Sequence, residues 1–383
     1  METLFWFSLS LILYTYAGYP LLLMLKSALF NKKVRKGFTE PRVSIVLSAF
    51  NEEKTIEEKL RNLVELDYPS EKLEILVGSD GASDKTDEII SKFDSSRIRF
   101  FRFVRNIGKP HVLKSLAEEA RGSLLVFTDA RQEFEHGAIR ALVQNFQDPE
   151  VGCVSGELYF KPARNGKNRS VGEGMNAYWR YEKFLRKKES EIASMLGATG
   201  AIYAIRRSLF PEELPFDILV DDMYIPLSII EKGYRAVFEA EARAYDRSSE
   251  CSREEFRRKV RTLAGNYQIF LHFSGLFLPF RSPIAWQIFS HKFLRVVVPF
   301  FLAVLFVSNL FLVARPFHAV FMILQSIFYG MAAMEAGRAG REGNKKGFGY
   351  LPYVFCLLNY SALVGLGRFL TRGQKVAWEK AYA

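Results

Sequence analysis

Cysteine and histidine are scarce in this 383-residue chain, which contains 3 cysteines and 5 histidines. The cysteines, Cys153, Cys251 and Cys356, lie far apart, and their spacing does not suit a metal site. The histidines occur singly. This composition argues against a disulfide framework and against a zinc site, and it predicts reduced thiols.

Acidic residues are fewer than basic ones, with 42 Asp and Glu against 53 Lys and Arg, which gives a formal net charge of +11. An excess of positive charge suits a polyanionic partner such as phosphate groups or an anionic membrane surface. The chain is 49% hydrophobic and 14% aromatic. Together with its length, this composition allows one large soluble domain and several membrane spans.

Long apolar runs occur near both ends of the chain. The first extends from Thr3 to about Phe30 and is almost uncharged until Lys26. It exceeds the roughly 20 residues that a helix needs to cross a bilayer. A cleaved signal peptide is the alternative, but the start of the run has no basic residue and no small-residue cleavage site follows it. We therefore predict an uncleaved transmembrane anchor over residues 1–30.

Basic residues follow this anchor directly. They are Lys32, Lys33, Arg35 and Lys36. Positively charged loops stay on the cytoplasmic side of a membrane, so the chain from residue 31 onward is expected in the cytoplasm.

The C-terminal part, residues 296–383, is predicted to hold further transmembrane helices and a tail. The candidate spans are Val296–Ala314, Phe317–Met334 and Phe348–Leu366. Basic residues between the last two favour a cytoplasmic loop, but the basic tail would then lie outside, so the side of the tail stays open. The apolar stretch Ile269–Phe280 is too short to span, and residues 269–295 are predicted to form an interfacial segment.

Between these membrane segments, residues 41–268 alternate short apolar runs with amphipathic ones. The strand-like runs are Val43–Ser48, Leu73–Ser79, Ile98–Val104 and Leu124–Thr128, and the helix-like segments are Thr55–Leu66, Asp84–Phe93 and Pro110–Ala120. Strands that alternate with helices predict an α/β domain with a mostly parallel sheet.

Polar residues follow each strand-like run. They are Asn51-Glu52-Glu53, Asp80-Gly81-Ala82-Ser83-Asp84, Asn106-Ile107-Gly108-Lys109 and Asp129. Each group alone is explained as well by a turn or a helix cap. Ligands of such sheets, however, bind beyond the carboxyl ends of the strands, where all four groups would meet. Carboxylates there can bind ribose, a base or a divalent cation, and a lysine can offset diphosphate charge.

Five segments carry a resemblance to a known family: VSIVLSAFNEEKTIEEKL, VGSDGASDKT, RNIGKPHVLKSLAEEARGSLLVFTDA, GATGAIYAIRR and VDDMYIPLSIIEKGYRAVFEAEARAY. Together they resemble the family 2 glycosyltransferases, especially the membrane-integrated branch that includes hyaluronan, cellulose and poly-N-acetylglucosamine synthases. The resemblance covers about residues 42–270. It implies the Rossmann-like GT-A fold of nucleotide-diphosphosugar transferases, here with transmembrane helices at both ends.

The resemblance also implies roles for individual residues. Asp222 corresponds to the catalytic base, and Asp129 to a ligand of Mg²⁺ or Mn²⁺. The residues implied in donor binding are Asn51, Glu52, Asp80, Lys109, Asp129, Arg258 and Arg261. Those implied on the acceptor side are Gly197, Thr199, Gly200, Asp221 and Thr262.

The chain departs from the family pattern at two places. Where the family carries Asp-x-Asp at the metal, this chain has Asp129-Ala130-Arg131, so metal binding would rest on one carboxylate. Where processive synthases carry Gln-x-x-Arg-Trp, it has Arg258-Lys259-Val260-Arg261-Thr262. The arginine is kept, but the aromatic residue is lost, which puts acceptor stacking and processivity in doubt. The alternative for the basic residues is a face near lipid headgroups.

The resemblance implies an inverting glycosyltransferase, transferring a hexosyl or N-acetylhexosaminyl group. The donor is a nucleotide-diphosphate sugar, with a UDP-sugar ranked first, and the acceptor is a glycan or a lipid-linked molecule. The expected location is a bacterial-type inner or plasma membrane with the catalytic domain in the cytoplasm. The expected process is polysaccharide or glycolipid synthesis. The expected partners are these substrates, the lipid bilayer and other polysaccharide-export components, but no nucleic acid.

Two alternatives remain open at this point. One stays within the family and contrasts a processive synthase with an enzyme that adds a single sugar to a polyprenyl or other lipid acceptor. The other is a catalytically inactive membrane scaffold or nucleotide-binding regulator with the same fold. Retention of Asp80, Asp129 and Asp222 argues against the second alternative.

Overall fold

The computed structural model describes residues 1–161, 172–247, 252–280, 282–338, 349–371 and 373, with only the backbone for 172–177, 247 and 252–255. An eight-stranded sheet of order β3-β2-β1-β4-β7-β6-β8-β5 forms its centre. The strands are β1 (Val43–Ala49), β2 (Leu73–Asp80), β3 (Ile98–Phe103), β4 (Leu124–Asp129), β5 (Glu133–Phe134), β6 (Val151–Lys161), β7 (Tyr203–Arg206) and β8 (Arg235–Arg247).

Most strand pairings are parallel. β3, β2, β1 and β4 run parallel to one another, as do β6 and β8. β7 is antiparallel to both β4 and β6, and β5 is antiparallel to β8. The predicted α/β fold with a mostly parallel sheet is therefore confirmed, and the strands expected from residues 43 to 128 are all present.

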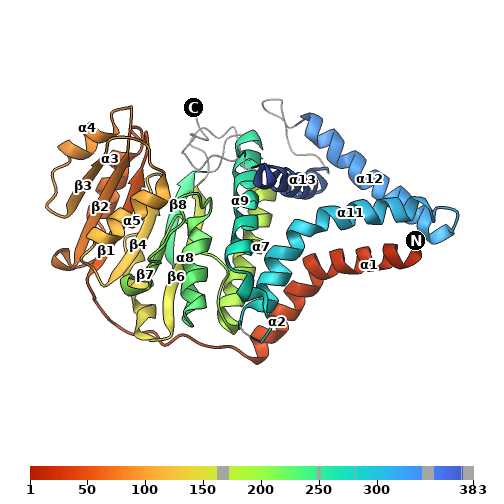
Figure 1. The fold of residues 1–383 in the computed structure, drawn as a ribbon, viewed down its shortest axis with the longest axis horizontal. Helices are drawn as coiled ribbons and strands as arrows, with labels where there is room; N and C mark the ends of the chain where they lie inside the picture. Colours follow the sequence, from red (N-terminus) through yellow and green to blue (C-terminus); the bar gives the residue numbers. More distant parts are fainter. Residues whose placement is uncertain (162–171, 248–251, 281, 339–348, 372, 374–383) are drawn as a thin grey trace.

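Helices cover both faces of this sheet (Figure 1). Successive residues of a strand point to opposite faces, and β1 accordingly divides its side chains between two cores. Ile45 packs in the core that includes Leu60, whereas Val46 packs with Leu113 and Ile229. The covering helices are α3 (Ile56–Val64), α4 (Thr86–Lys92), α5 (Lys109–Glu119), α6 (Ala138–Val143) and α8 (Asp221–Glu231). Because β1 is buried throughout, its sequence is a continuous apolar run with two serines.

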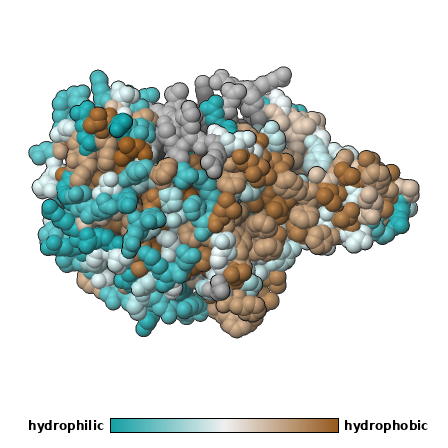
Figure 2. Space-filling view, in the orientation of Figure 1, coloured by the Kyte–Doolittle hydropathy of each residue, from teal (hydrophilic) through white to brown (hydrophobic). Residues whose placement is uncertain are grey.

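Four helical stretches are long and apolar enough to cross a membrane: Glu2–Leu29, Ala285–Leu310, Pro316–Arg338 and Tyr350–Leu370. The first consists of α1 (Glu2–Leu13), a π-helical turn and α2 (Tyr19–Leu29), and the second of α10 (Ala285–Gln287), the π-helical turn η6 (Ile288–Phe293) and α11 (Leu294–Leu310). The others are α12 (Pro316–Arg338) and α13 (Tyr350–Leu370). In Figures 1 and 2, α1, α11 and α12 form an apolar arm that extends away from a hydrophilic sheet domain.

The second apolar stretch begins earlier than the sequence indicates. Its helix starts at Ala285 rather than near residue 296, and Ile269 still belongs to α9 (Ser252–His272). The segment 269–295 is therefore divided between two helices. Lys292 and Arg295 lower the hydropathy of this stretch, which hid its first turns from sequence analysis.

Two helices lie between the sheet and the apolar arm (Figure 1). They are α7 (Gly172–Ile192) and α9. α7 packs against α2, and α9 packs against α13, where a side chain at Gly365 would meet the Ala264 backbone at 3.1 Å. The sheet domain and the long apolar helices are thus joined through α7 and α9.

Candidate active site

The loops that follow β1 and β2 are fastened to each other. Asn51 adopts a positive φ of 55°, and its side-chain oxygen accepts a hydrogen bond from the backbone N–H of Ser83 at 2.7 Å. The N–H of Glu52 donates to the hydroxyl of Thr86 at 2.7 Å. The two residues expected at the donor therefore hold the turn that a nucleotide would face.

Asp80, at the end of β2, shapes the next loop. Its carboxylate accepts hydrogen bonds from the N–H groups of Ile107 at 2.7 Å and Gly108 at 3.0 Å. Burial raises the pKa of Asp80, and these two hydrogen bonds act in the opposite direction. Gly81 permits this approach, because its φ is +69° and a Cβ there would lie 2.5 Å from the Arg105 backbone. Asp80 thus positions the loop that leads into Lys109.

Lys109, the first residue of α5, joins two acidic residues from distant parts of the chain. Its Nζ donates to Oδ1 of Asp129 at 2.9 Å and lies 3.3 Å from Oδ2 of Asp221. Burial disfavours the charged form, but the two carboxylates raise the pKa of Lys109 above its ordinary value. Burial also opposes ionisation of Asp129, yet Lys109 and more weakly Arg131 and Lys59 hold its pKa below the usual range. Asp221, expected on the acceptor side, lies against a candidate donor-binding residue.

Asp222 faces the same space from the start of α8. Its Oδ2 accepts a hydrogen bond from the N–H of Gly200 at 3.2 Å. A Cβ at Gly200 would lie 3.4 Å from this oxygen and 3.8 Å from Oδ2 of Asp129, so Gly200 lies in van der Waals range of both carboxylates. Burial, and then the negative charge of Asp221, raises the pKa of Asp222 to about 6. A carboxylate with this pKa is ionised at neutral pH and still able to take up a proton.

The segment before β7 connects α8 to the sheet. The N–H of Thr199 donates to the hydroxyl of Ser155 at 3.0 Å, and the N–H of Ala198 donates to the backbone oxygen of Asp222 at 2.8 Å. A Cβ added at Gly197 would lie 3.3 Å from Cγ of Met223. The structure therefore brings the expected acceptor-side glycines next to the expected base.

The two arginines of α9 that were expected at the donor lie one helical turn apart. Arg258 lies 5.7 Å over the ring of Trp179, and the exposed Thr262 donates its hydroxyl to the backbone oxygen of Arg258 at 3.0 Å. Arg261 precedes Gly265 by about one helical turn, and Gly265 packs where a side chain would meet Val220 at 2.8 Å. Val220 directly precedes the two acids of α8, so α9 packs beside the start of α8 at Gly265.

Lys59 and Arg186 were not found by sequence analysis. Lys59 is 3% exposed and donates to the Thr128 hydroxyl at 2.9 Å and the Gln132 backbone oxygen at 2.6 Å. Burial lowers its pKa to about 7, although Asp129 acts in the opposite direction. The sequence does indicate that Lys59 is buried, because it lies at helical spacing on the apolar stripe of α3 with Ile56, Leu60 and Leu63. Arg186 of α7 acts electrostatically on Asp222, and no sequence motif marks it.

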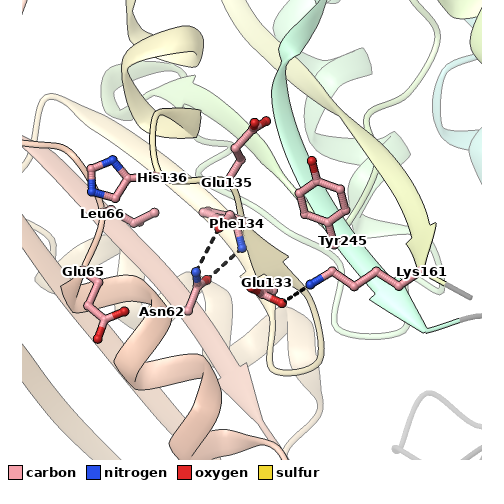
Figure 3. Close-up of a pocket in the computed structure, with 9 residues that line it drawn as sticks. All are labelled: Asn62, Glu65, Leu66, Glu133, Phe134, Glu135, His136, Lys161 and Tyr245. Atoms are coloured by element: carbon pink, nitrogen blue, oxygen red, sulfur yellow. Dashed lines mark hydrogen bonds and ion pairs between the residues drawn. The ribbon is translucent and has the colours of Figure 1, made fainter. Parts of the chain in front are cut away.

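A pocket of about 380 Å³ lies elsewhere, between α3, β5 and β8 (Figure 3). Its walls include Asn62, which bonds to the backbone of Phe134, and the ion pair of Lys161 with Glu133 at 2.5 Å. None of the residues expected to be functional lines it. The candidate active site is instead the open edge of the sheet where Lys109, Asp129 and Asp222 meet.

Comparisons with known proteins agree with this fold. Residues 44–213 match the glycosyl transferase family 2, and residues 129–363 match the glycosyl transferase family group 2. The chain therefore belongs to the family 2 glycosyltransferases.

Two relatives by sequence and one solved structure are similar to this chain. "Probable glycosyltransferase YdaM" of Bacillus subtilis is 28% identical over 71% of this chain, and poly-beta-1,6-N-acetyl-D-glucosamine synthase of Staphylococcus aureus is 24% identical over 60%. The aligned regions span 66% and 55% of these two relatives. The mannosyltransferase PcManGT from Pyrobaculum calidifontis, solved with GDP-Man and Mn²⁺, has the same fold. Its TM-score is 0.73 at 20% identity, over 97% of this chain and 100% of that one.

Proposed function

We propose that this chain is an inverting glycosyltransferase that uses a nucleotide-diphosphate sugar, with a UDP-sugar ranked first. It transfers a hexosyl or N-acetylhexosaminyl group to a glycan or lipid-linked acceptor at the cytoplasmic membrane face, in polysaccharide or glycolipid synthesis. The observation that carries this proposal is the convergence of Lys109, Asp129 and Asp222 around Gly200.

Asp222 acts as the general base. With a pKa of about 6 it is ionised at neutral pH, and it accepts the proton of the acceptor hydroxyl as that oxygen attacks the anomeric carbon. The attack comes from the face opposite the leaving nucleoside diphosphate. A single displacement therefore inverts the anomeric configuration, and an α-linked donor gives a β-linked product.

Lys109 stabilises the leaving group, assisted by Arg261. Negative charge grows on the nucleoside diphosphate as the glycosidic bond breaks. An ammonium that is already fixed by Asp129 and Asp221 needs little reorganisation to stabilise this charge in the transition state.

The acidic cluster also fits a divalent cation. Asp129 and Asp221 lie against the ammonium of Lys109, and Asp222 faces the same space, while Arg131, Lys59 and Arg186 act on these carboxylates more weakly. In the described part of the chain, no three Asp, Glu, His or Cys side chains form a ligand set by themselves. Asp129 would hold Mg²⁺ or Mn²⁺, and the donor phosphates would supply further oxygens. Such a cation neutralises diphosphate charge when bound.

The cytoplasmic orientation is supported by contacts of the basic segment after α2. Lys32 forms an ion pair with Glu150 at 2.7 Å, and Lys36 pairs with Glu239 at 2.6 Å. These contacts keep the basic segment on the same side of the membrane as the catalytic domain. A basic segment of this kind favours the cytoplasmic side.

The test is a panel of nucleotide sugars incubated with the full-length protein in lipid, with Mn²⁺ present or chelated. The expected result is release of one nucleoside diphosphate, most rapidly from a UDP-sugar, together with a product of inverted configuration by NMR. Asp222→Asn protein is the matched inactive control. No release from any donor in the panel, or a product of retained configuration, would contradict the proposal.

A further inference from the structure

A second buried cluster of charges lies between α7 and the start of the second apolar stretch. Glu182 pairs with Arg295 and lies 3.3 Å from Nε2 of His291. Glu189 lies 2.6 Å from Nδ1 of the same histidine and accepts a hydrogen bond from the hydroxyl of Tyr19 at 2.6 Å. Both carboxylates are at most 4% exposed, and Oε2 of Glu189 is buried without a hydrogen-bond partner among the described residues.

The cations of this cluster outnumber its carboxylates. Lys292 lies within electrostatic range of Glu182, Arg186 and Arg295. Among the described residues, neither Arg186 nor Lys292 has a carboxylate at ion-pair distance. The Nε and Nη2 atoms of Arg295 are buried without a hydrogen-bond partner in the described structure. Three cations thus share two carboxylates, and the two buried guanidinium nitrogens of Arg295 that have no partner are costly unless a ligand compensates them.

The position of Arg186 ties this cluster to the acceptor side of the active site. Tyr178, Glu182 and Arg186 follow one another at four-residue spacing and so lie on one face of α7. From that face Arg186 also acts on Asp222, the proposed base. Lys292 and Arg295 belong to a stretch that is apolar enough to cross a membrane. An anion bound here would therefore lie between the membrane and the base, whereas Lys109 serves the donor diphosphate on the other side.

We propose that Arg186, Lys292 and Arg295 form a phosphate-binding subsite for a lipid-linked acceptor. The assignment rests on the proposed function and names its acceptor class. Guanidinium groups bind phosphate oxygens through paired N–H donors, and a lysine adds a point charge. A lipid phosphate held at this subsite enters from the bilayer, and its attached sugar or hydroxyl extends towards Asp222.

The test measures binding without a donor, so that it does not depend on turnover. Full-length protein in phosphatidylcholine nanodiscs is titrated calorimetrically with farnesyl phosphate, farnesol, inorganic phosphate and UDP, with empty nanodiscs subtracted. Arg186→Gln and Lys292→Gln should each weaken farnesyl phosphate binding by about tenfold or more, the loss expected for one charge-assisted contact. Lys187→Gln, which removes an exposed charge from the same helix, is the matched control and should bind normally. Arg186→Lys should recover part of the affinity.

The probes separate the sources of phosphate. Tight binding of farnesyl phosphate, with weak binding of farnesol and inorganic phosphate, supports the lipid assignment. Equal binding of farnesol, equal binding of inorganic phosphate, or unchanged affinity in both glutamine variants would overturn it. A parallel loss of UDP affinity would assign these cations to the donor instead. Failure of every nucleotide sugar to react, with farnesyl phosphate binding intact, would refute the proposed function and leave the subsite standing.

Discussion

One charged cluster lies where β4 and α8 begin or end at the sheet, and another lies between α7 and the second apolar stretch; their charge balances differ. At the sheet edge, three carboxylates surround Lys109. Beside the membrane, Arg186, Lys292 and Arg295 share two carboxylates. The pKa values follow this difference. Burial and a neighbouring acid raise the pKa of Asp222 to about 6, whereas Arg295 and His291 overcome burial and hold the pKa of Glu182 well below its usual range.

The difference in charge balance suggests which ligand each cluster binds. A cluster with excess negative charge is completed by a cation, here one bound with the donor. A cluster with excess positive charge is completed by an anion, here the phosphate of an acceptor. Neutralising an acid should therefore have opposite effects on stability in the two places.

The largest effect on stability is expected at the membrane-side cluster. Glu182→Gln removes the buried ion-pair partner of Arg295 and leaves this guanidinium uncompensated. Breaking a buried ion pair in this way lowers stability by about 3–5 kcal/mol. The measurement is the apparent Tm of detergent-solubilised protein at pH 7.5.

Glu133→Gln is the control for this prediction, because Glu133 pairs with Lys161 where both side chains are about half exposed. An exposed pair contributes about 0–1 kcal/mol, so its Tm should change little. Equal Tm changes in the two variants would contradict the assignment of a cation-rich cluster that depends on Glu182.

Asp222→Asn should have the largest effect on turnover and no destabilising effect. Loss of the general base should cut kcat by about a hundredfold or more, the lower end of such contributions. Since the pKa of Asp222 is raised, its charged form opposes folding above pH 6, and the amide should keep or raise the Tm at pH 8. Steady-state kinetics and a UDP titration measure these effects. Retention of more than a tenth of wild-type turnover would mean that Asp221 or another group is the base.

The effect of Mn²⁺ on UDP affinity tests the role of the acidic residues at the sheet edge. Asp129→Ala should remove the gain in UDP affinity that Mn²⁺ provides, because no carboxylate at position 131 can replace it. Arg131→Asp should increase that gain by restoring a second acid, and Arg131→Gln separates this effect from loss of the arginine. Calorimetric titrations of UDP with and without Mn²⁺ provide the measurement. Unchanged metal dependence in Asp129→Ala would remove Asp129 from the site.

Thr262 is an exposed residue of α9, and its substitution tests acceptor retention. The residue is exposed and offers no aromatic face, so we expect short or single-sugar products from the wild-type protein. Thr262→Trp should lengthen the product, because a stacking ring contributes about 1–3 kcal/mol in contacts between bases and aromatic residues. Thr262→Leu is the control for added bulk. Mass spectrometry measures product length, and long polymer from the wild-type protein would contradict the argument.

The donor half of the molecule could be predicted from its sequence because local patterns determine it. Asp80 and Asp129 end strands and Lys109 starts the helix after a third one, so the shared edge of a parallel sheet brings them together. Lys59 could also have been found, since a lysine on the apolar stripe of α3 must be buried with a partner.

The membrane-side cluster could not be predicted because its residues meet only through tertiary packing. Arg186 lies on a helix that carries charges on several faces, so periodicity does not distinguish it. Lys292 and Arg295 interrupt an apolar run and were assigned to an interfacial segment, whereas the structure buries their stretch against α7. The contact of Asp221 with Lys109 likewise joins residues that no local pattern relates.

The smallest expected effect is a shift in pH dependence at the sheet-edge cluster. Asp222 must be ionised to accept a proton, so kcat/KM should rise with pH through a midpoint near 6. Burial is the larger cause of this raised pKa, and the charge of Asp221 is the second. Asp221→Asn removes that repulsion and leaves Lys109 in place, so the midpoint should move down by about one pH unit or less. Asp217→Asn, an exposed acid just before α8, should leave the midpoint unchanged. A midpoint that stays near 6 in Asp221→Asn would mean that burial alone raises the pKa of Asp222. The negative charge of Asp221 would then not contribute to it.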